Sequence, residues 1–294
     1  MQYPPIQAQS SAMRGAVWMF GAVASFTVMA LAGRAAVTQL DTFEIMLYRS
    51  LMGIVIVMGI ATARGQLSAV RVDRLPLHFA RNIAHFAGQN LWFFALASIP
   101  LAQVFALEFT TPIWVILLAP FIVKERITAI GLVAAALGFI GIMLIADPDP
   151  ANLSAPIIAA AAAAVFFALT ALFTRRLTQN QSVLTILIWL TIMQAGFALI
   201  CAGYDGQIAL PNRVTLPYLV LIGCAGLTAH FCLTKALSLA PASIVMPIDF
   251  VRLPIIAVLG MLFYDEPLNG WIFIGAVLIF SGNWPNMYYS NKNR

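Results

Sequence analysis

The chain has 294 residues, of which 62% are hydrophobic and only 9% charged, and its mean hydropathy is +0.92. A soluble domain of this length needs more polar residues to cover its surface, so the composition indicates an all-α integral membrane protein surrounded by lipid bilayer. On a soluble protein the net charge of +5 would suggest a nucleic acid partner; here it reflects membrane topology, and no nucleic acid partner is expected.

Ten apolar runs of about 20 residues follow one another along the chain, each long enough to cross a hydrocarbon core of about 30 Å as a helix. In chain order, the predicted transmembrane helices are 15–34, 43–63, 79–98, 101–123, 127–146, 156–174, 183–203, 215–237, 243–264 and 271–289. The first lacks the small-residue cleavage site of a signal peptide and is expected to be retained. These ten spans leave no stretch for a soluble domain.

Basic residues are distributed unequally between the two sides of this topology. With the N-terminus in the cytoplasm, the outer side receives only Arg34 and Arg213. The cytoplasmic side receives Arg14, Arg64, Arg71, Arg74, Lys124, Arg126, Arg175, Arg176, Lys235, Lys292 and Arg294. The positive-inside rule therefore predicts a multi-pass protein with both termini in the cytoplasm.

The sequence repeats itself after 141 residues. This offset aligns Pro100 with Pro241 and Glu125 with Glu266 without a gap. Because each half holds five spans, an odd number, the second half must cross the membrane in the opposite direction. The sequence thus predicts ten transmembrane helices as two inverted five-helix repeats, 1–148 and 149–294, around a central cavity, which is typical of secondary transporters.

Two recurring motifs mark these halves. Short proline-containing turns, SIPLA at 98–102 and LAPAS at 239–243, precede the fourth and ninth spans, and a glutamate opens a glycine-rich helix in each half. In these features nearly the whole chain resembles the EamA-type members of the drug/metabolite transporter superfamily, most closely their aromatic amino acid exporters. The resemblance implies a cell inner membrane exporter of amino acids, aromatic or otherwise apolar, and of related small metabolites.

Four charged residues stand out within the predicted spans: Arg49, Glu108, Asp249 and Arg252. A charge at the centre of a membrane helix costs about 2.5–3.5 kcal/mol on insertion scales, so each is a candidate for substrate binding. The two acids lie 141 positions apart and thus correspond between the halves. Asp249 and Arg252 are three residues apart, on one face of a helix, where they can pair.

Two interpretations of these charges remain open. In the first, an Asp249–Arg252 pair and an Arg49–Glu108 pair only lower the cost of packing polar groups. In the second, Arg252 binds a substrate carboxylate while Asp249 holds it in place. Glu108 would then bind a substrate ammonium group or a coupling proton, since burial favours the neutral form of a carboxyl group.

Polar residues of the third span and prolines of the fourth and ninth add further candidates. His85, Gln89 and Asn90 are expected to face the cavity, although interhelical hydrogen bonds would explain each equally well. His230, 141 positions after Gln89, joins them. Thr111 and Trp114 complete the candidate set, since they flank Pro112, and Pro112, Pro120, Pro247 and Pro254 are expected to bend or break their helices.

The functions that remain are those of a gradient-driven transporter. The chain has neither a nucleotide-binding loop nor the motifs of metalloproteases or serine hydrolases, so no enzyme activity is expected. The histidines lack ligand partners at metal-binding spacing, and neither metal nor cofactor is expected. A channel or facilitator for small polar solutes and an intramembrane enzyme are the alternatives. The alanine run 159–164 suits close helix packing, either within the fold or in a homodimer.

Overall fold

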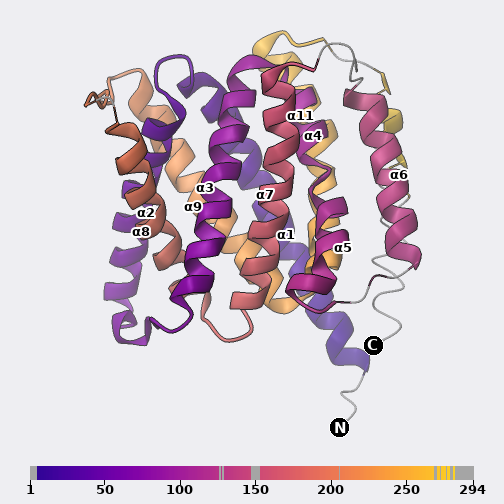
Figure 1. Ribbon diagram of the computed structural model, residues 1–294, viewed down its shortest axis with the longest axis horizontal. Helices are drawn as coiled ribbons and strands as arrows, with labels where there is room; N and C mark the ends of the chain where they lie inside the picture. Colours follow the sequence, from indigo (N-terminus) through magenta and orange to yellow (C-terminus); the bar gives the residue numbers. More distant parts are fainter. Residues whose placement is uncertain are drawn as a thin grey trace.

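The computed structural model describes residues 5–125, 127, 129–146, 153–204, 206–267, 270–271, 273–275, 277–278 and 281. Throughout these residues the regular structure is helical, with no strand (Figure 1). Most of the predicted tenth span, 271–289, lies outside the described residues. The predicted all-α architecture is therefore confirmed where the structure describes the chain.

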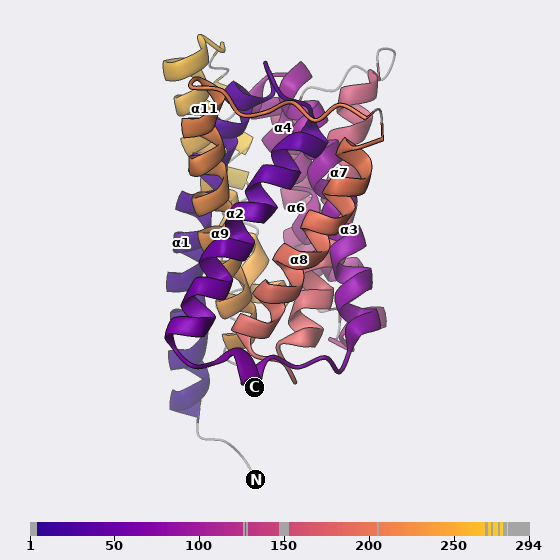
Figure 2. The same ribbon diagram turned by 90° about the vertical axis from the view of Figure 1, so that its left-hand side faces the viewer.

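The helices run roughly along one common direction and form a bundle (Figures 1 and 2). In chain order they are α1 (Pro5–Ala36), α2 (Thr42–Ala63), the 3₁₀ helix η1 (Leu67–Ala69), α3 (Leu75–Ser98), α4 (Leu101–Glu108), α5 (Thr111–Ile122), α6 (Ala129–Ala146), α7 (Ala155–Leu177), α8 (Val183–Ala202), α9 (Thr215–Leu239), α10 (Ala242–Val245), the 3₁₀ helix η2 (Met246–Val251) and α11 (Arg252–Tyr264).

Six stretches of the described chain are long and apolar enough to cross a membrane. They are Met13–Ala36, Thr42–Ala63, Leu101–Ile122, Ala155–Leu177, Val183–Ala202 and Thr215–Leu239. Helix α3 is equally long but more polar, and its polar side chains, such as those of Arg81, Asn82 and His85, are buried against other helices. The protein is thus a multi-pass membrane protein whose third helix turns its polar face inward.

The predicted breaks at Pro112 and Pro247 are confirmed, whereas Pro120, which was also expected to bend or break its helix, lies inside α5. The stretch Leu101–Ile122 divides into α4 and α5 at Phe109 and Thr110, directly before Pro112. The stretch 243–264 divides into α10, η2 and α11, and its 3₁₀ segment contains Pro247 and ends before Pro254. Each proline lacks the N–H that an unbroken helix would use, so both helices change geometry at depth in the bundle.

Three helix pairs form the most extensive contacts: α1 with α9, α3 with α7, and α2 with α8. The alanines of α7 are part of this packing. Ala160, Ala163 and Ala164 are fully buried within the protein, and α3 approaches so closely that a methyl group at Gly88 would lie 3.0 Å from Phe166 and Phe167. The alanine run therefore serves contacts inside the fold.

Candidate functional site

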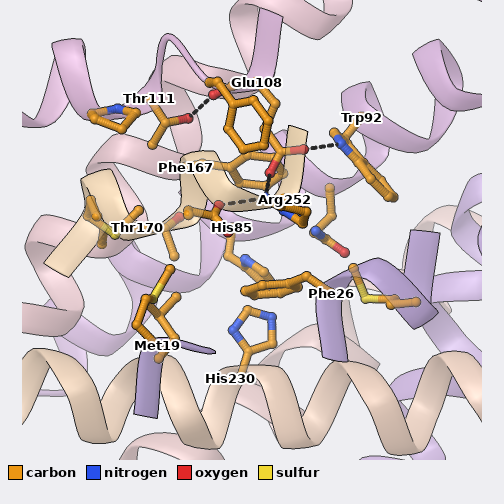
Figure 3. A pocket seen from close by; sticks show the side chains of 18 residues that line it. Met19, Phe26, His85, Trp92, Glu108, Thr111, Phe167, Thr170, His230 and Arg252 are labelled. Atoms are coloured by element: carbon orange, nitrogen blue, oxygen red, sulfur yellow. Dashed lines mark hydrogen bonds and ion pairs between the residues drawn. The ribbon is translucent and has the colours of Figure 1, made fainter. Parts of the chain in front are cut away.

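A cavity lies where the broken helices meet α1, α3, α7 and α9 (Figure 3). Its lining combines ionisable, aromatic and sulfur-containing side chains. The lining residues are Met19, Phe26, Met29, His85, Gln89, Trp92, Glu108, Phe109, Thr111, Pro112, Phe167, Thr170, Ala171, His230, Leu233, Met246, Asp249 and Arg252. The cavity volume is about 60 Å³, so this closed conformation has room for a few water molecules and not for a metabolite.

One guanidinium group joins two carboxylates at the centre of this cavity. Arg252 Nη2 lies 2.6 Å from Glu108 Oε1 and 2.6 Å from Asp249 Oδ2. All three residues are buried, with Arg252 only 2% exposed. We call these residues the ion triad. Two carboxylates and one guanidinium carry a net charge of −1 when all are ionised. Within the described residues, Asp249 Oδ1 is buried and has no hydrogen-bond partner.

Aromatic rings surround the guanidinium of Arg252. Its carbon lies 4.8 Å from the ring centre of Phe105 and 5.3 Å from those of Phe26 and Phe109. At such distances the negative faces of the rings attract a cation. The low polarity of the rings also strengthens the electrostatic interactions within the ion triad.

Two side chains fix the position of Glu108. Trp92 Nε1 donates a hydrogen bond of 2.7 Å to Glu108 Oε2. The Thr111 hydroxyl donates to the backbone carbonyl of Glu108 at 2.6 Å, the carbonyl that Pro112, four residues later, cannot bond. The carbonyl that the helix break frees is therefore hydrogen-bonded by a neighbouring side chain. The break places the Glu108 carboxylate in the cavity at the end of α4.

Histidine rings and amides occupy the opposite wall. The rings of His85 on α3 and His230 on α9 meet edge to face at 4.6 Å, and their nitrogens have no hydrogen-bond partner in the described structure. Beside them, Gln89 accepts a hydrogen bond from Arg49 on α2. Polar groups from α2, α3 and α9 thus meet at the cavity wall.

The structure brings together most of the residues that the sequence suggested. Seven of them line the cavity: His85, Gln89, Glu108, Thr111, His230, Asp249 and Arg252. Arg49 stands behind Gln89, outside the cavity lining. The Arg49–Glu108 pair of the first interpretation is wrong, because Glu108 pairs with Arg252 instead. That Asp249 and Arg252 pair is confirmed.

Two candidates lie elsewhere. Asn90 donates a hydrogen bond to the carbonyl of Phe86, four residues earlier in α3, and does not line the cavity. Trp114 is 38% exposed on the bundle surface. In this conformation neither residue contacts the ion triad.

Several lining residues were missed from the sequence, although the 141-residue offset could have found them. It pairs Phe26 with Phe167 and Met29 with Thr170, and all four line the cavity. Each residue alone looks like an ordinary apolar or weakly polar residue of a membrane helix. Only their correspondence across the halves distinguishes them.

Metal and redox chemistry have no visible support in the described part of the chain. It contains no group of three or more metal-binding side chains, and Cys201, Cys224 and Cys232 are free thiols. Once widened beyond its present volume, the cavity would offer a small amphipathic molecule rings for its apolar part and the ion triad for its polar part.

An ion pair also lies at each of two opposite ends of the bundle. At the end where α4 begins, Arg34 Nη2 lies 3.4 Å from Glu266 Oε1, and Glu266 accepts from the backbone N–H of Leu101 at 2.9 Å. At the opposite end, Arg175 Nε lies 3.7 Å from Glu125 Oε1. We call these the Arg34 clamp and the Arg175 clamp.

Sequence comparison identifies the family. The model of the EamA-like transporter family matches the chain twice, at residues 13–146 and 154–284. The chain belongs to the EamA-like transporter family. The resemblance inferred from its motifs is therefore confirmed, and the protein is a membrane transporter rather than an enzyme.

Characterised relatives cover most of the chain. A riboflavin transporter of Vibrio cholerae is 28% identical over 272 residues, 91% of this chain and 90% of the relative. A riboflavin transporter of Rhizobium johnstonii is 31% identical over 221 residues, 74% of this chain and 72% of the relative. An S-adenosylmethionine uptake transporter of Rickettsia prowazekii is 23% identical and covers 96% of this chain and 95% of the relative.

A solved crystal structure shares the fold. It superposes with a TM-score of 0.76 at 17% identity and covers 97% of this chain and 98% of that chain. At this identity the likeness concerns the fold alone.

Proposed function

We propose that this EamA-like transporter is a secondary transporter that moves a flat, ring-containing metabolite by alternating access through the cavity of the ion triad. The observation that carries the proposal is the position of Arg252, bound by two carboxylates and enclosed by the rings of Phe26, Phe105 and Phe109. Rings of this kind can stack on an aromatic substrate, while the ion triad binds its polar group.

The printed names of the relatives support a ring-containing substrate. Riboflavin and S-adenosylmethionine differ in charge and overall shape, but each contains a flat nitrogen heterocycle. The amino acid export expected from the sequence has no support from these names. Aromatic amino acids nevertheless belong in a substrate panel, because they combine a ring with charged groups that suit the ion triad.

We further infer that 1–148 and 149–294 form inverted repeats of five spans each, in the bacterial inner membrane, with both termini in the cytoplasm. The double family match supports two halves. Under the 141-residue offset, α1 corresponds to α7 and α9 to α3, so the contacts α1–α9 and α3–α7 are counterparts. Such paired contacts are expected from a twofold relation between inverted halves.

Transport assays with purified full-length protein in proteoliposomes test the proposal. The panel contains labelled riboflavin, S-adenosylmethionine, tryptophan, phenylalanine and leucine, each with and without an imposed pH gradient. We expect saturable flux for at least one ring-containing compound and none for leucine. Absence of saturable flux across the whole panel would contradict the proposal, and a preference for leucine would overturn its substrate class.

Glu108 is the candidate for carrying a coupling proton. The substitution Glu108→Gln mimics its protonated form and leaves Arg252 paired with Asp249, so the charges of the site then sum to zero. We expect Glu108→Gln to lose acceleration by a pH gradient while substrate exchange across the membrane continues. Flux in the wild type that does not respond to pH would remove this role.

Arg252 is the candidate for binding the polar group of the substrate. Its removal alone would leave two buried carboxylates without a partner, which threatens folding. The double substitution Arg252→Ala/Asp249→Asn retains the net charge of −1 and is expected to fold but not transport. Arg71→Gln, on an exposed loop, is the control. Full activity of a folded double variant would favour the purely structural interpretation of the triad.

A further inference from the structure

Two other arginines are buried without any acidic partner in the described structure. Arg49 is 6% exposed and Arg81 is 1% exposed. Arg49 donates to Gln89, and Arg81 donates to Thr174 Oγ1 at 3.2 Å and to Asn82 Oδ1 at 2.9 Å. All of these acceptors are neutral. A buried guanidinium is costly unless an opposite charge accompanies it, so these two residues differ sharply from the paired Arg252.

The surrounding charges do not supply that partner. Arg49 and Arg81 lie close enough to repel each other. The buried carboxylate of Glu44 is bound at the end of α2 by the backbone N–H groups of Asp41 and Ala209, at 3.0 Å and 2.6 Å. The carboxylates of the ion triad are bound to Arg252. A local surplus of positive charge therefore remains around Arg49.

A small pocket lies directly beside Arg49, between α2, α8 and α9. Its polar lining comprises Arg49, Ser50, Thr191, Gln194 and His230, and its volume is about 20 Å³. That volume accepts one occupant of about the size of a water molecule. A metabolite carboxylate or a phosphate group is too large, whereas a single halide ion is of suitable size.

The pocket offers hydrogen-bond donors for an anion. Both ring nitrogens of His230 have no partner in the described structure, and one nitrogen of a neutral imidazole carries a proton. The Ser50 hydroxyl also lines the pocket. The Arg49 guanidinium has further N–H groups beyond the one bound to Gln89. Charge and donors from α2 and α9 thus converge on one water-sized space.

The backbone also makes room for this arginine. A methyl group added at Gly226 on α9 would lie 3.0 Å from Arg49 Nε. Glycine at this position therefore lets the guanidinium rest against the backbone of α9. The methyl group would also lie 3.3 Å from Met29 Sδ, whereas the corresponding close approach at Gly223 concerns Met52. Among the described glycines, Gly226 is therefore the position at which an added methyl group meets Arg49.

We propose that Arg49, with Ser50 and His230, binds a halide ion, chloride under cellular conditions, in the pocket between α2, α8 and α9. The anion balances the charge of Arg49 and fixes its side chain. Because Arg49 also holds Gln89 in the cavity wall, anion occupancy sets the shape of the substrate cavity without contact between anion and substrate.

Thermal unfolding of the full-length protein in detergent tests anion binding independently of transport. Sodium chloride and sodium bromide are titrated against sodium gluconate at constant ionic strength. We expect the unfolding temperature to rise saturably with either halide and not with gluconate. Arg49→Gln should raise the halide concentration at half-saturation about tenfold or more, since a charged hydrogen-bond donor is lost. Arg71→Gln should leave this concentration unchanged.

A second variant keeps the test decisive if Arg49→Gln does not fold. Gly226→Ala retains every charge but displaces the guanidinium, so it should also weaken the rise of the unfolding temperature with halide. Gly59→Ala, which has nothing within 4 Å of the added methyl group, should not weaken it. Bromide soaked into crystals should give an anomalous peak beside Arg49. A halide response equal to that of gluconate, or one retained in Gly226→Ala, would mean that the pocket holds a buried water only.

Discussion

The Arg34 clamp and the Arg175 clamp are built from corresponding residues at opposite ends of the bundle. The 141-residue offset relates Arg34 to Arg175 and Glu125 to Glu266. Each clamp also ties its arginine to a backbone carbonyl, that of Leu96 in one and Leu237 in the other, and these two leucines correspond as well. Each clamp joins the two segments that match the family model, so each can act as a gate between the halves.

The two clamps differ in how tightly they close. The Arg–Glu distance is 3.4 Å in the Arg34 clamp and 3.7 Å in the Arg175 clamp, at similar exposure. At Gly260 an added methyl group would lie 2.7 Å from Glu266 Oε2, so this glutamate rests against α11. The position that corresponds to Gly260 is Ala119. The two ends thus differ at this position by one methyl group, and we expect the Arg175 clamp, which has the longer ion pair, to open first.

Removal of the glutamate charge is expected to have the largest effect. Glu266→Gln loses the ion pair with Arg34 and weakens the bonds from the Leu101 N–H. Loss of a charged hydrogen bond of about 1.5–3 kcal/mol should raise access to the cavity from that end about tenfold or more. Access is measured as the rate at which a membrane-impermeant thiol reagent, added on one side, modifies Thr170→Cys in a variant without native cysteines.

Glu125→Gln is the matched comparison at the opposite end. It should raise access from the other side, and by a smaller factor, because the ion pair that it removes is longer. Arg71→Gln serves as the charge control. If both variants opened the same side, the assignment of the clamps to opposite gates would fail.

A smaller effect is expected when the clamp is loosened without loss of charge. Gly260→Ala pushes a methyl group against Glu266 Oε2 and should raise access at the Arg34 end a few-fold, in the same direction as Glu266→Gln. Gly59→Ala has open space around the added methyl group and should change nothing. Unchanged access in Gly260→Ala would show that this close contact does not set the strength of the clamp.

The smallest effect should follow from Ala119→Gly. If the Ala119 methyl group keeps Glu125 at a distance, its removal should lower access at the Arg175 end about twofold. Glycine also lowers helix stability by about 1 kcal/mol, so Ala97→Gly on exposed α3 surface is the control. An increase in access at the Arg175 end would reverse the interpretation of the methyl group.

Much of the fold could be predicted because bilayer thickness and hydrophobic pattern determine the spans. Breaks at spans four and nine also followed from their prolines. The helix boundaries were less certain: α7 begins at Ala155 and ends at Leu177, where the sequence predicted 156–174. Arg175 and Arg176 extend the helix past the apolar run, because basic residues suit the last turn of a helix.

The sequence predicted which charged residues lie in the candidate site, but not which of them pair with each other. Charge, rarity and the 141-residue offset identified Glu108, Asp249 and Arg252. Which acid binds which arginine depends on helix rotation, and the sequence gives no rotation for α4 relative to α2. Trp114 is the opposite case. Its position near Pro112 suggested that it lines the cavity, but its side chain faces outward.

Helix α4 connects the Arg34 clamp, at its first residue, with the ion triad, at its last residue. Its first backbone N–H is bound by Glu266, and its last residue, Glu108, binds Arg252. Eight helical residues make a stiff rod of roughly 12 Å. We therefore expect movement of the clamp to be transmitted along this rod to the ion triad, so that opening of this end and reorganisation of the triad occur together.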